Sequence, residues 1–330
     1  MTPIPTGITL IVGADPSTVI DVVEHALHPQ QSANSPKAVE AERGERLRRI
    51  SPARTLEFGE HRLTYLPDGF VQLIPRAWFP ETGDGDWQRH AEHLDRDGCL
   101  TASVGSLLVE FKGRALLIDT GYGPRRTAPA DSYPFLGAEE GGRLPESLTV
   151  HGLAPEAVDT IAFTHLHEDH VGGAFAPAET GSGLLFGSAR FVTSATEWRG
   201  WHGAPSAAAA RHLQKHAIGA ADGQEIFPGV TAWNTPGHTL GHTSYIITSG
   251  GRRLVVIGDA LHSAVQVERP RWRVLVDSAR DISVDSRLKI LRELSAPDTL
   301  GFGGHFADVL FGRVVTDGSQ RRWEALDVAR

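Results

Sequence analysis

Residues 160–173 read Thr-Ile-Ala-Phe-Thr-His-Leu-His-Glu-Asp-His-Val-Gly-Gly, and this stretch decides both the fold and the chemistry. Its first part, Thr160–Thr164, is apolar and rich in strand-forming residues, so we expect a buried strand that ends directly at His165. Ligand sites of α/β proteins lie at the carboxyl ends of such strands. The residues that follow Thr164 are therefore expected in a functional site.

Three histidines and two acidic residues stand within the six positions 165–170. In an extended segment His165 and His167 point to the same side, while Asp169 and His170 turn the other way as the chain bends into two glycines. Burying so many polar and like-charged groups together is costly unless cations are bound. The spacing therefore predicts two adjacent metal ions.

Further ligands are expected downstream, each beside a glycine: Gly237-His238, Gly258-Asp259 and Gly304-His305. Glycine allows a sharp turn after a strand, so each strand end can deliver one ligand. The remaining histidines that we interpret as exposed or core residues are His25, His28, His61, His90, His93, His151, His212 and His216.

Together these motifs resemble the metallo-β-lactamase superfamily. The residues that carry the resemblance are Thr164–His170, Pro236-Gly237-His238, Gly258-Asp259, Gly304-His305 and Leu117-Ile118-Asp119-Thr120-Gly121. The resemblance covers roughly residues 55–310, and its histidine-rich signature is highly specific. It implies an α/β fold, the four-layer αββα metallo-β-lactamase sandwich, preceded here by an N-terminal extension.

The resemblance also implies the ligand set of a dinuclear centre. One metal ion would be held by His165, His167 and His238, a second by Asp169, His170 and His305, and Asp259 would bridge them. Asp119 would hold the metal-binding loop from outside the centre. Because the order is not the His-x-Glu-x-Asp-His of di-iron relatives, two zinc ions are favoured, and other divalent metals stay open.

Within the superfamily, the stretches 235–244 and 258–266 look closest to the methyl parathion hydrolase and acyl-homoserine lactonase group. Lactonases commonly have a tyrosine where this chain has His262, which favours the parathion hydrolase side. We expect a metal-bridging hydroxide to attack an ester, lactone or phosphotriester. Asp259 and His262 are the predicted catalytic residues, although His262 equally suits an ordinary hydrogen-bonded role.

Trp198 and Trp201 are predicted to form an aromatic wall of the substrate pocket, with burial in the core as the alternative. Two other functions stay open: a glyoxalase II-like thioesterase, which would need a basic surface for glutathione, and a metal-binding relative without catalysis. The sequence has no GxSxG, GxxxxGK or HExxH motif, so other hydrolase and nucleotide-binding templates do not apply.

The composition favours a small-molecule substrate as the partner, rather than nucleic acid or a membrane. The 330 residues carry a formal charge of −8 at pH 7, which disfavours nucleic acid, and a single cysteine, Cys99, excludes an intramolecular disulfide. The N-terminus lacks the pattern of a signal peptide, and no apolar run is long enough to cross a bilayer. We therefore expect a cytoplasmic protein without membrane contact.

We expect two regions, an N-terminal extension over 1–50 and a hydrolase domain over 51–330. The extension should contain a strand at 8–14, a helix from Asp15 to His28 and a polar linker, and the sequence leaves open whether it covers the pocket or mediates homodimerisation. In the domain we expect hairpins at 107–119 and 244–257, helices at 206–217 and 286–294, and long loops at 78–98 and 120–150.

Overall fold

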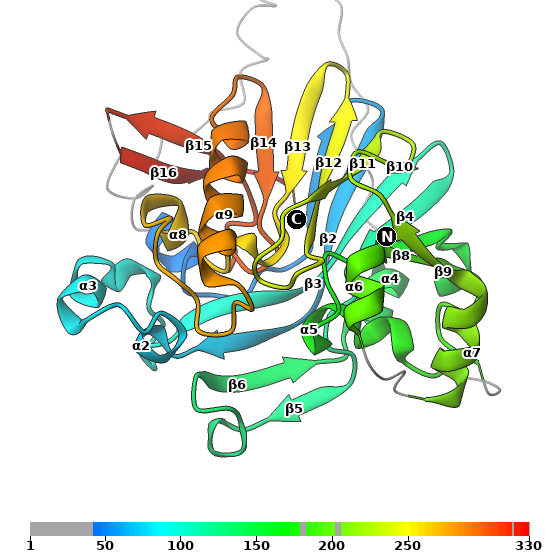
Figure 1. Cartoon of the computed structure of the whole chain (residues 1–330), viewed down its shortest axis with the longest axis horizontal. Helices are drawn as coiled ribbons and strands as arrows, with labels where there is room; N and C mark the ends of the chain where they lie inside the picture. Colours follow the sequence, from blue (N-terminus) through cyan, green and yellow to red (C-terminus); the bar gives the residue numbers. More distant parts are fainter. Residues whose placement is uncertain (1–41, 179–182, 202–205, 319, 330) are drawn as a thin grey trace, which may run out of the picture. The chain divides into compact units, whose positions relative to one another are not determined.

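A large mixed β-sheet is built mainly from the first half of the chain (Figure 1). Within the described residues it has nine strands, in the order β5-β6-β2-β3-β4-β7-β8-β9, with β1 paired to β2. Their bounds are β1 Arg54–Phe58, β2 His61–Leu73, β3 Leu100–Phe111, β4 Arg114–Ile118, β5 Arg125–Thr127, β6 Leu136–Gly141, β7 Thr160–Ala162, β8 Arg190–Ser194 and β9 Ala217–Ala220. Strands β4, β7, β8 and β9 run parallel, so β4, β7 and β8 end at the same edge of the sheet.

The second sheet follows the chain order from β10 to β16. All its neighbouring strands are antiparallel except β13 and β14, which are parallel. Their bounds are β10 Glu225–Phe227, β11 Val230–Asn234, β12 Thr243–Ser249, β13 Arg252–Val256, β14 Thr299–Phe302, β15 Phe311–Asp317 and β16 Gln320–Ala325. Because β13 and β14 are parallel, the residues after them emerge side by side.

The coordinates come from a computed structural model that describes residues 42–178, 183–201, 206–318 and 320–329. The strand and helix expected at 8–28 lie outside these ranges. The described residues belong to one compact unit that begins at Ala41. Residues 42–46 are helical, and Leu47 is buried among core residues of this unit.

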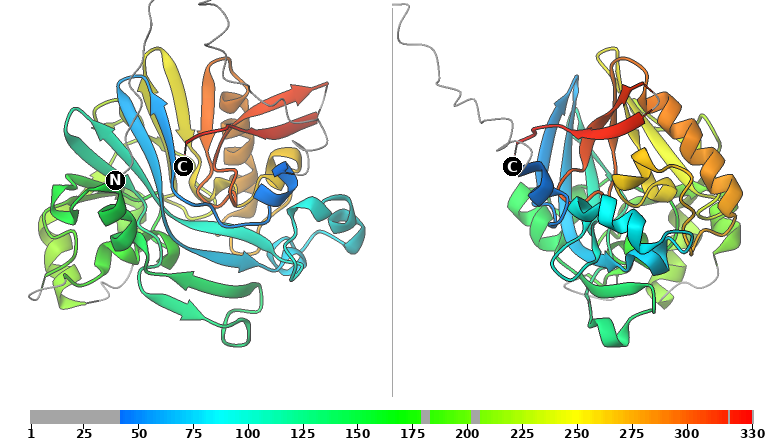
Figure 2. Two further views of the ribbon diagram at one scale, coloured as in Figure 1. Left: turned by 180° about the vertical axis from the view of Figure 1, so that it is seen from behind. Right: turned by 90° about the vertical axis from the view of Figure 1, so that its left-hand side faces the viewer.

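Helices cover the outer faces of both sheets. They are α2 Pro75–Trp78, α3 Asp84–Arg89, α4 Leu144–His151, α5 Glu168–Val171, α6 Ala195–Gly200, α7 Ala207–His216, α8 Val265–Glu268 and α9 Arg280–Leu294. Short 3₁₀ turns lie at Ala91–His93, Pro129–Asp131, Pro155–Ala157, Gly173–Phe175 and Gly258–Ala260. The side view in Figure 2 shows α9 lying outside the strands of the second sheet.

Three apolar clusters separate four layers. Tyr65 and Val109 of the first sheet meet Tyr245 and Phe302 of the second in a buried core between the sheets. A second cluster joins the first sheet to α4, with Leu148 fully buried, and a third joins the second sheet to α9. Burial of apolar surface on both faces of each sheet drives this arrangement. The fold class expected from the sequence, an αββα sandwich, is confirmed.

The expected hairpins and helices are present, with shifted ends. The helix predicted at 286–294 begins earlier, at Arg280, because polar residues on its first turns hide the apolar periodicity. The expected loop at 120–150 instead contains β5, β6 and α4, and the expected loop at 78–98 contains α3. These short elements lack the regular apolar alternation on which strand and helix prediction depends. No helix in the described part is long and apolar enough to span a bilayer.

Candidate metal centre

Three predicted ligands and the predicted supporting residue Asp119 stand just beyond the ends of four strands. His165 follows β7, Asp259 follows β13 and His305 follows β14, while Asp119 is the residue directly after β4. The short helix α5 begins after His167, which turns the chain back. Because strands of both sheets end at this place, residues far apart in the sequence converge there.

Three histidines form the first group. Nδ1 of His167 lies 2.9 Å from Nε2 of His165 and 3.0 Å from Nε2 of His238. His165 and His238 are buried, and burial with the neighbouring His170 and His167 holds the pKa of His165 well below its usual value. Burial and the neighbouring His238 lower the pKa of His167 to about 4. One nitrogen of each of the three rings therefore faces a common point, the geometry that a cation requires.

Asp169, His170 and His305 form the second group, with Asp259 between the two groups. Asp259 Oδ2 lies 3.4 Å from His238 Nε2 and 3.8 Å from His165 Nε2. Its other oxygen, Oδ1, lies 3.3 Å from His170 Nε2 and 3.2 Å from His305 Nε2. One carboxylate oxygen thus faces each group, as a bridging ligand must.

Contacts on the far side of each ring fix the direction of the ligand nitrogens. His170 Nδ1 donates to Asp119 Oδ2 at 2.9 Å, and His305 Nδ1 donates to the carbonyl of Ser103 at 2.8 Å. His238 Nδ1 lies 3.0 Å from Asp277 Oδ1. A proton held on Nδ1 leaves Nε2 free to bind a metal.

The donor set fits two divalent ions. His170 Nε2 and Asp259 Oδ1 are buried without a hydrogen-bond partner among the described residues. Such orphaned atoms are costly unless something binds them. The five histidine nitrogens and two carboxylates of the two groups are ligands that zinc prefers.

The carboxylates of this centre are ionised. Burial by itself raises the pKa of Asp259, but His170, His305 and His262 together outweigh it and hold the pKa of that carboxyl well below its usual range. For the same reason the pKa of Asp169 lies well below normal, because His170 and His305 face it.

His262 lies on the other side of Asp259 from the second group, with Nε2 3.2 Å from Asp259 Oδ2. Its ring stands edge-on to Trp78 at a centroid distance of 5.2 Å, and burial lowers its pKa. Its backbone N–H donates to Gln266 Oε1 at 2.6 Å. Because its pKa is lowered, the ring is neutral. It forms part of the wall of the adjoining pocket.

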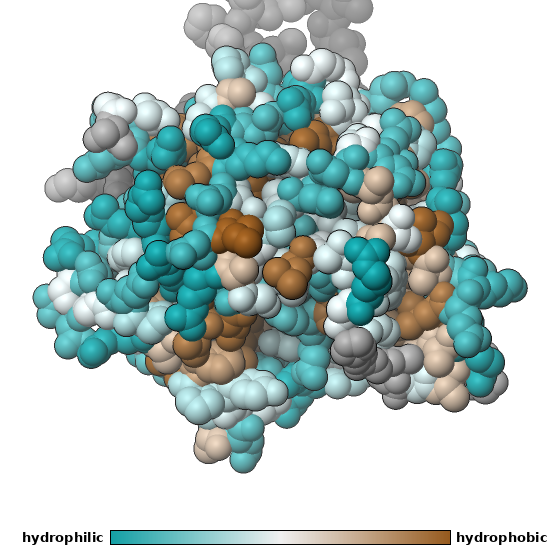
Figure 3. Space-filling model, in the orientation of Figure 1, coloured by the Kyte–Doolittle hydropathy of each residue, from teal (hydrophilic) through white to brown (hydrophobic). Residues whose placement is uncertain are grey.

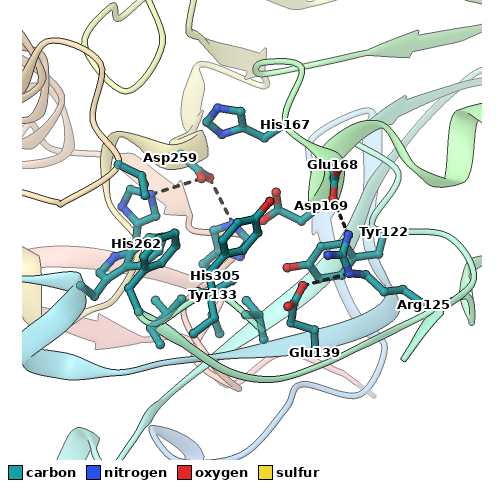
Figure 4. Close-up of a pocket in the computed structure, with 17 residues that line it drawn as sticks. Tyr122, Arg125, Tyr133, Glu139, His167, Glu168, Asp169, Asp259, His262 and His305 are labelled. Atoms are coloured by element: carbon teal, nitrogen blue, oxygen red, sulfur yellow. Dashed lines mark hydrogen bonds and ion pairs between the residues drawn. The ribbon is translucent and has the colours of Figure 1, made fainter. Parts of the chain in front are cut away.

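A cavity of about 340 Å³ opens over the second group and His167 (Figure 4). One side is apolar, and the other carries polar groups, with Arg125 bound between Glu139 and Glu168. The apolar side consists of Val71, Leu73, Trp78, Ala102, Phe135, Leu136 and Val276. Figure 3 shows apolar side chains gathered beside the β5–β6 hairpin, which bears Tyr133 and Phe135 near its tip.

Trp198 and Trp201 do not line this cavity, which corrects the expectation that they form its wall. Trp198 Nε1 donates to the carbonyl of Ile218 at 2.9 Å, and the ring of Trp201 stacks on Phe175 at 5.5 Å. Both pack on the second apolar cluster. The alternative interpretation, core tryptophan, describes them better.

The sequence reasoning missed several residues at the site. Asp277, which orients His238, and Glu197, which accepts from the backbone of Leu166 at 3.0 Å, carry no local motif. His242 accepts from the backbone N–H of Asp259 at 2.9 Å and stands in the same glycine-flanked segment as His238. That segment was the signal that could have identified His242.

The comparisons with known proteins agree on one family. The sequence profile described as Metallo-beta-lactamase superfamily matches residues 103–305. The human metallo-beta-lactamase domain-containing protein 1 is 27% identical over 263 residues, which is 74% of this chain and 82% of the human protein. The N-acyl homoserine lactonase AiiB of Agrobacterium fabrum is 36% identical over 77 residues, 21% of this chain and 28% of AiiB.

Solved structures agree with the fold. The dizinc quorum-quenching lactonase AidC superposes with a TM-score of 0.70 at 22% identity, covering 85% of this chain and 99% of AidC. The hydrolase AbOPH gives a TM-score of 0.69 at 24% identity, covering 86% of this chain and 100% of that chain. Similarity at this level of identity establishes a shared architecture.

Proposed function

Because the chain belongs to the metallo-β-lactamase superfamily, we propose that it is a hydrolase that uses two divalent metal ions, zinc by preference, to cleave an ester-type bond. The observation that carries this proposal is the convergence of two ligand groups on the two oxygens of Asp259, at the floor of an open pocket. The residues that would hold the first ion are His165, His167 and His238, and those that would hold the second are Asp169, His170 and His305.

Two ions bound there would supply Lewis acidity toward a carbonyl or phosphoryl oxygen and lower the pKa of a bound water. The protein's own groups do the rest. Asp119, Asp277 and Ser103 hold the ligand rings in place through their Nδ1 atoms. His262, neutral and beside Asp259 in the pocket wall, is placed to donate or accept a proton at the substrate.

The pocket favours an uncharged substrate with an apolar group. Its apolar side can bury such a group, and Arg125 is already neutralised by Glu139 and the more exposed Glu168. A cavity of about 340 Å³ suits a small to medium ligand. Lactones, aryl esters and phosphotriesters fit this description, and N-acyl homoserine lactones, named in the relative AiiB, belong to the same class.

A glyoxalase II-like thioesterase is less well supported. The anionic glutathione part of its substrate would need free cations, but Arg125 is the one Arg or Lys among the described residues lining the pocket and is already paired. A metal-binding relative without turnover is also less well supported, because the pocket gives a substrate access to the centre.

The test is a hydrolysis screen of the zinc-loaded protein against lactones, aryl esters, phosphotriesters, thioesters and β-lactams. Asp259→Asn is expected to lower turnover by at least about 100-fold, because even outer partners of metal ligands change activity by about 10–100-fold. Asp317→Asn, an exposed aspartate at the end of β15, is the matched control. Folded, metal-loaded protein inactive toward all five classes would refute the proposal, as would full activity in Asp259→Asn.

A further inference from the structure

A second cluster of potential metal ligands lies away from the main centre, where the end of α3 meets the end of α8. Its members are His90, Glu92, His93 and Glu268. Glu92 Oε1 lies 3.9 Å from His90 Nδ1 and 3.8 Å from His93 Nε2. Glu268 Oε2 lies 4.0 Å from His90 Nδ1. Ligand atoms of His90, Glu92 and His93 thus all lie within 4.8 Å of one another, and Glu268 approaches the same nitrogen of His90 from α8.

The distances between the potential ligand atoms are slightly longer than those around a bound metal ion. Ligand atoms of a tetrahedral zinc site with bonds of about 2.0 Å lie roughly 3.3 Å apart. The corresponding contacts of Asp259 with the main centre's histidines span 3.2 Å to 3.8 Å. Small side-chain movements of Glu92 and Glu268 would close the remaining gap, because both carboxylates are partly exposed.

An independent observation points to a ligand. The side chain of His90 is only 5% exposed, and its Nδ1 is buried with no hydrogen-bond partner among the described residues. A buried polar atom without a partner calls for an explanation, and an unseen ion is one of the accepted ones.

We propose that His90 Nδ1, Glu92, His93 Nε2 and Glu268 form a further binding site for one divalent transition-metal ion of the zinc type, separate from the hydrolytic centre. Imidazole and carboxylate ligands in equal number suit such an ion, and the two carboxylates balance its charge.

Arg269 competes with the ion. Its Nε donates to His90 Nε2 at 3.1 Å, which places the imidazole proton on Nδ1. Metal binding at Nδ1 moves that proton to Nε2, so the contact with Arg269 has to break. Arg269 is exposed and can turn into solvent. Removal of its guanidinium should therefore strengthen metal binding, the opposite of what loss of a carboxylate does.

The ion would brace the apolar cluster in which Trp78 of the pocket packs with Trp87 and Trp272. Trp272 packs edge-on against His90 at 5.6 Å and lies 5.1 Å from Trp87 of α3. Glu268 ends α8, the helix that directly follows the segment containing Asp259 and His262. A metal link between the turn Ala91–His93 and α8 would tie the aromatic segment that bears Trp87 to this helix and so stabilise the pocket without touching the substrate.

The test uses the full chain, stripped with a chelator, equilibrated with buffered zinc alone and analysed for bound zinc after gel filtration. Glu92→Gln and Glu268→Gln are each expected to bind about one zinc ion per chain fewer than wild type. Both glutamines keep the side-chain shape at partly exposed positions, so the fold is retained. Glu57→Gln, at an exposed glutamate on β1, is the control and should match wild type.

Zinc titration of Arg269→Ala gives a second readout. We expect its affinity for this ion to rise by about tenfold, because one hydrogen bond to His90 no longer has to break. Equal zinc content in wild type and both glutamine variants would overturn the site. So would an equal loss in Glu57→Gln, which would mark the bound ion as non-specific. Because the comparison counts the difference of one ion, it does not depend on the occupancy or activity of the main centre.

Discussion

The imidazole of His170 donates a hydrogen bond from Nδ1 to Asp119 Oδ2 at 2.9 Å, and its Nε2 lies 3.3 Å from Asp259 Oδ1. Asp119 is itself fixed, because its Oδ1 accepts from the backbone N–H of Thr164 at 2.8 Å. Its backbone has a positive φ of 59°, an uncommon conformation for a residue with a side chain. The aspartate after β4 thus sets the direction of a ligand after β7.

Asp119→Asn should weaken binding of the second metal ion. Asparagine removes the charge that stabilises the proton on His170 Nδ1, and loss of such an outer partner costs about 10–100-fold in affinity or activity. Zinc titration of stripped protein measures the effect, with exposed Asp131→Asn as the control. Unchanged zinc affinity would contradict the role assigned to Asp119.

His262→Gln should lower kcat by about 100-fold while leaving zinc content unchanged, if the ring transfers a proton at the substrate. His262 Nε2 lies 3.2 Å from Asp259 Oδ2 and the residue lines the pocket, but neither of its side-chain nitrogens has a hydrogen-bond partner among the described residues. Zinc analysis together with steady-state kinetics distinguishes proton transfer from metal binding. His151→Gln on α4 is the control. A lost ion in His262→Gln would instead make this residue a metal ligand.

Glu168→Gln should widen the substrate range toward anions. The variant removes one of the two carboxylates that neutralise Arg125, so the guanidinium becomes available to a negatively charged substrate. We expect kcat/KM for a carboxylate-bearing ester to rise by about 10-fold relative to its neutral analogue. The double variant Glu168→Gln/Arg125→Gln should abolish the gain, and a gain that persists there would show that Arg125 is not its source.

Cys99 should react slowly with alkylating reagents at neutral pH. Burial raises the pKa of its thiol to about 11, and the negative charges of Asp95 and Asp97 add to this. The thiolate is the reactive form, so the rate of alkylation should rise about tenfold per pH unit until the pH nears 11. Mass spectrometry after iodoacetamide treatment measures the profile. A plateau below pH 9 would contradict the raised pKa.

The sequence allowed the fold and the floor of the site to be predicted because both depend on local patterns. An apolar strand followed by His165, and a glycine beside His238, Asp259 and His305, are visible without any knowledge of distant contacts. The structure brings these residues together, and their role as ligands stays a prediction.

The pocket wall was not predictable in this way. Trp78, Tyr133 and Val276 line one cavity although about 200 positions separate the first from the last. The segments of Trp78 and Tyr133 lack periodicity and were expected to be loops. The hairpin of β5 and β6 was missed because its strands, Arg-Arg-Thr and Leu-Gly-Ala-Glu-Glu-Gly, show no apolar alternation. Trp198 and Trp201 were misplaced because an aromatic pair suits a core as well as a pocket.

The β5–β6 hairpin belongs to the edge of its sheet, whereas the predicted metal ligands follow strands in the interior of the two sheets. Tyr133 and Phe135 contact the pocket from the segment that joins these edge strands, without packing among the buried residues that separate the sheets. Substitutions at these two positions are therefore expected to leave the core between the sheets intact. Selection can therefore redirect this protein to new substrates by editing one peripheral loop, while the machinery that performs the reaction is inherited unchanged.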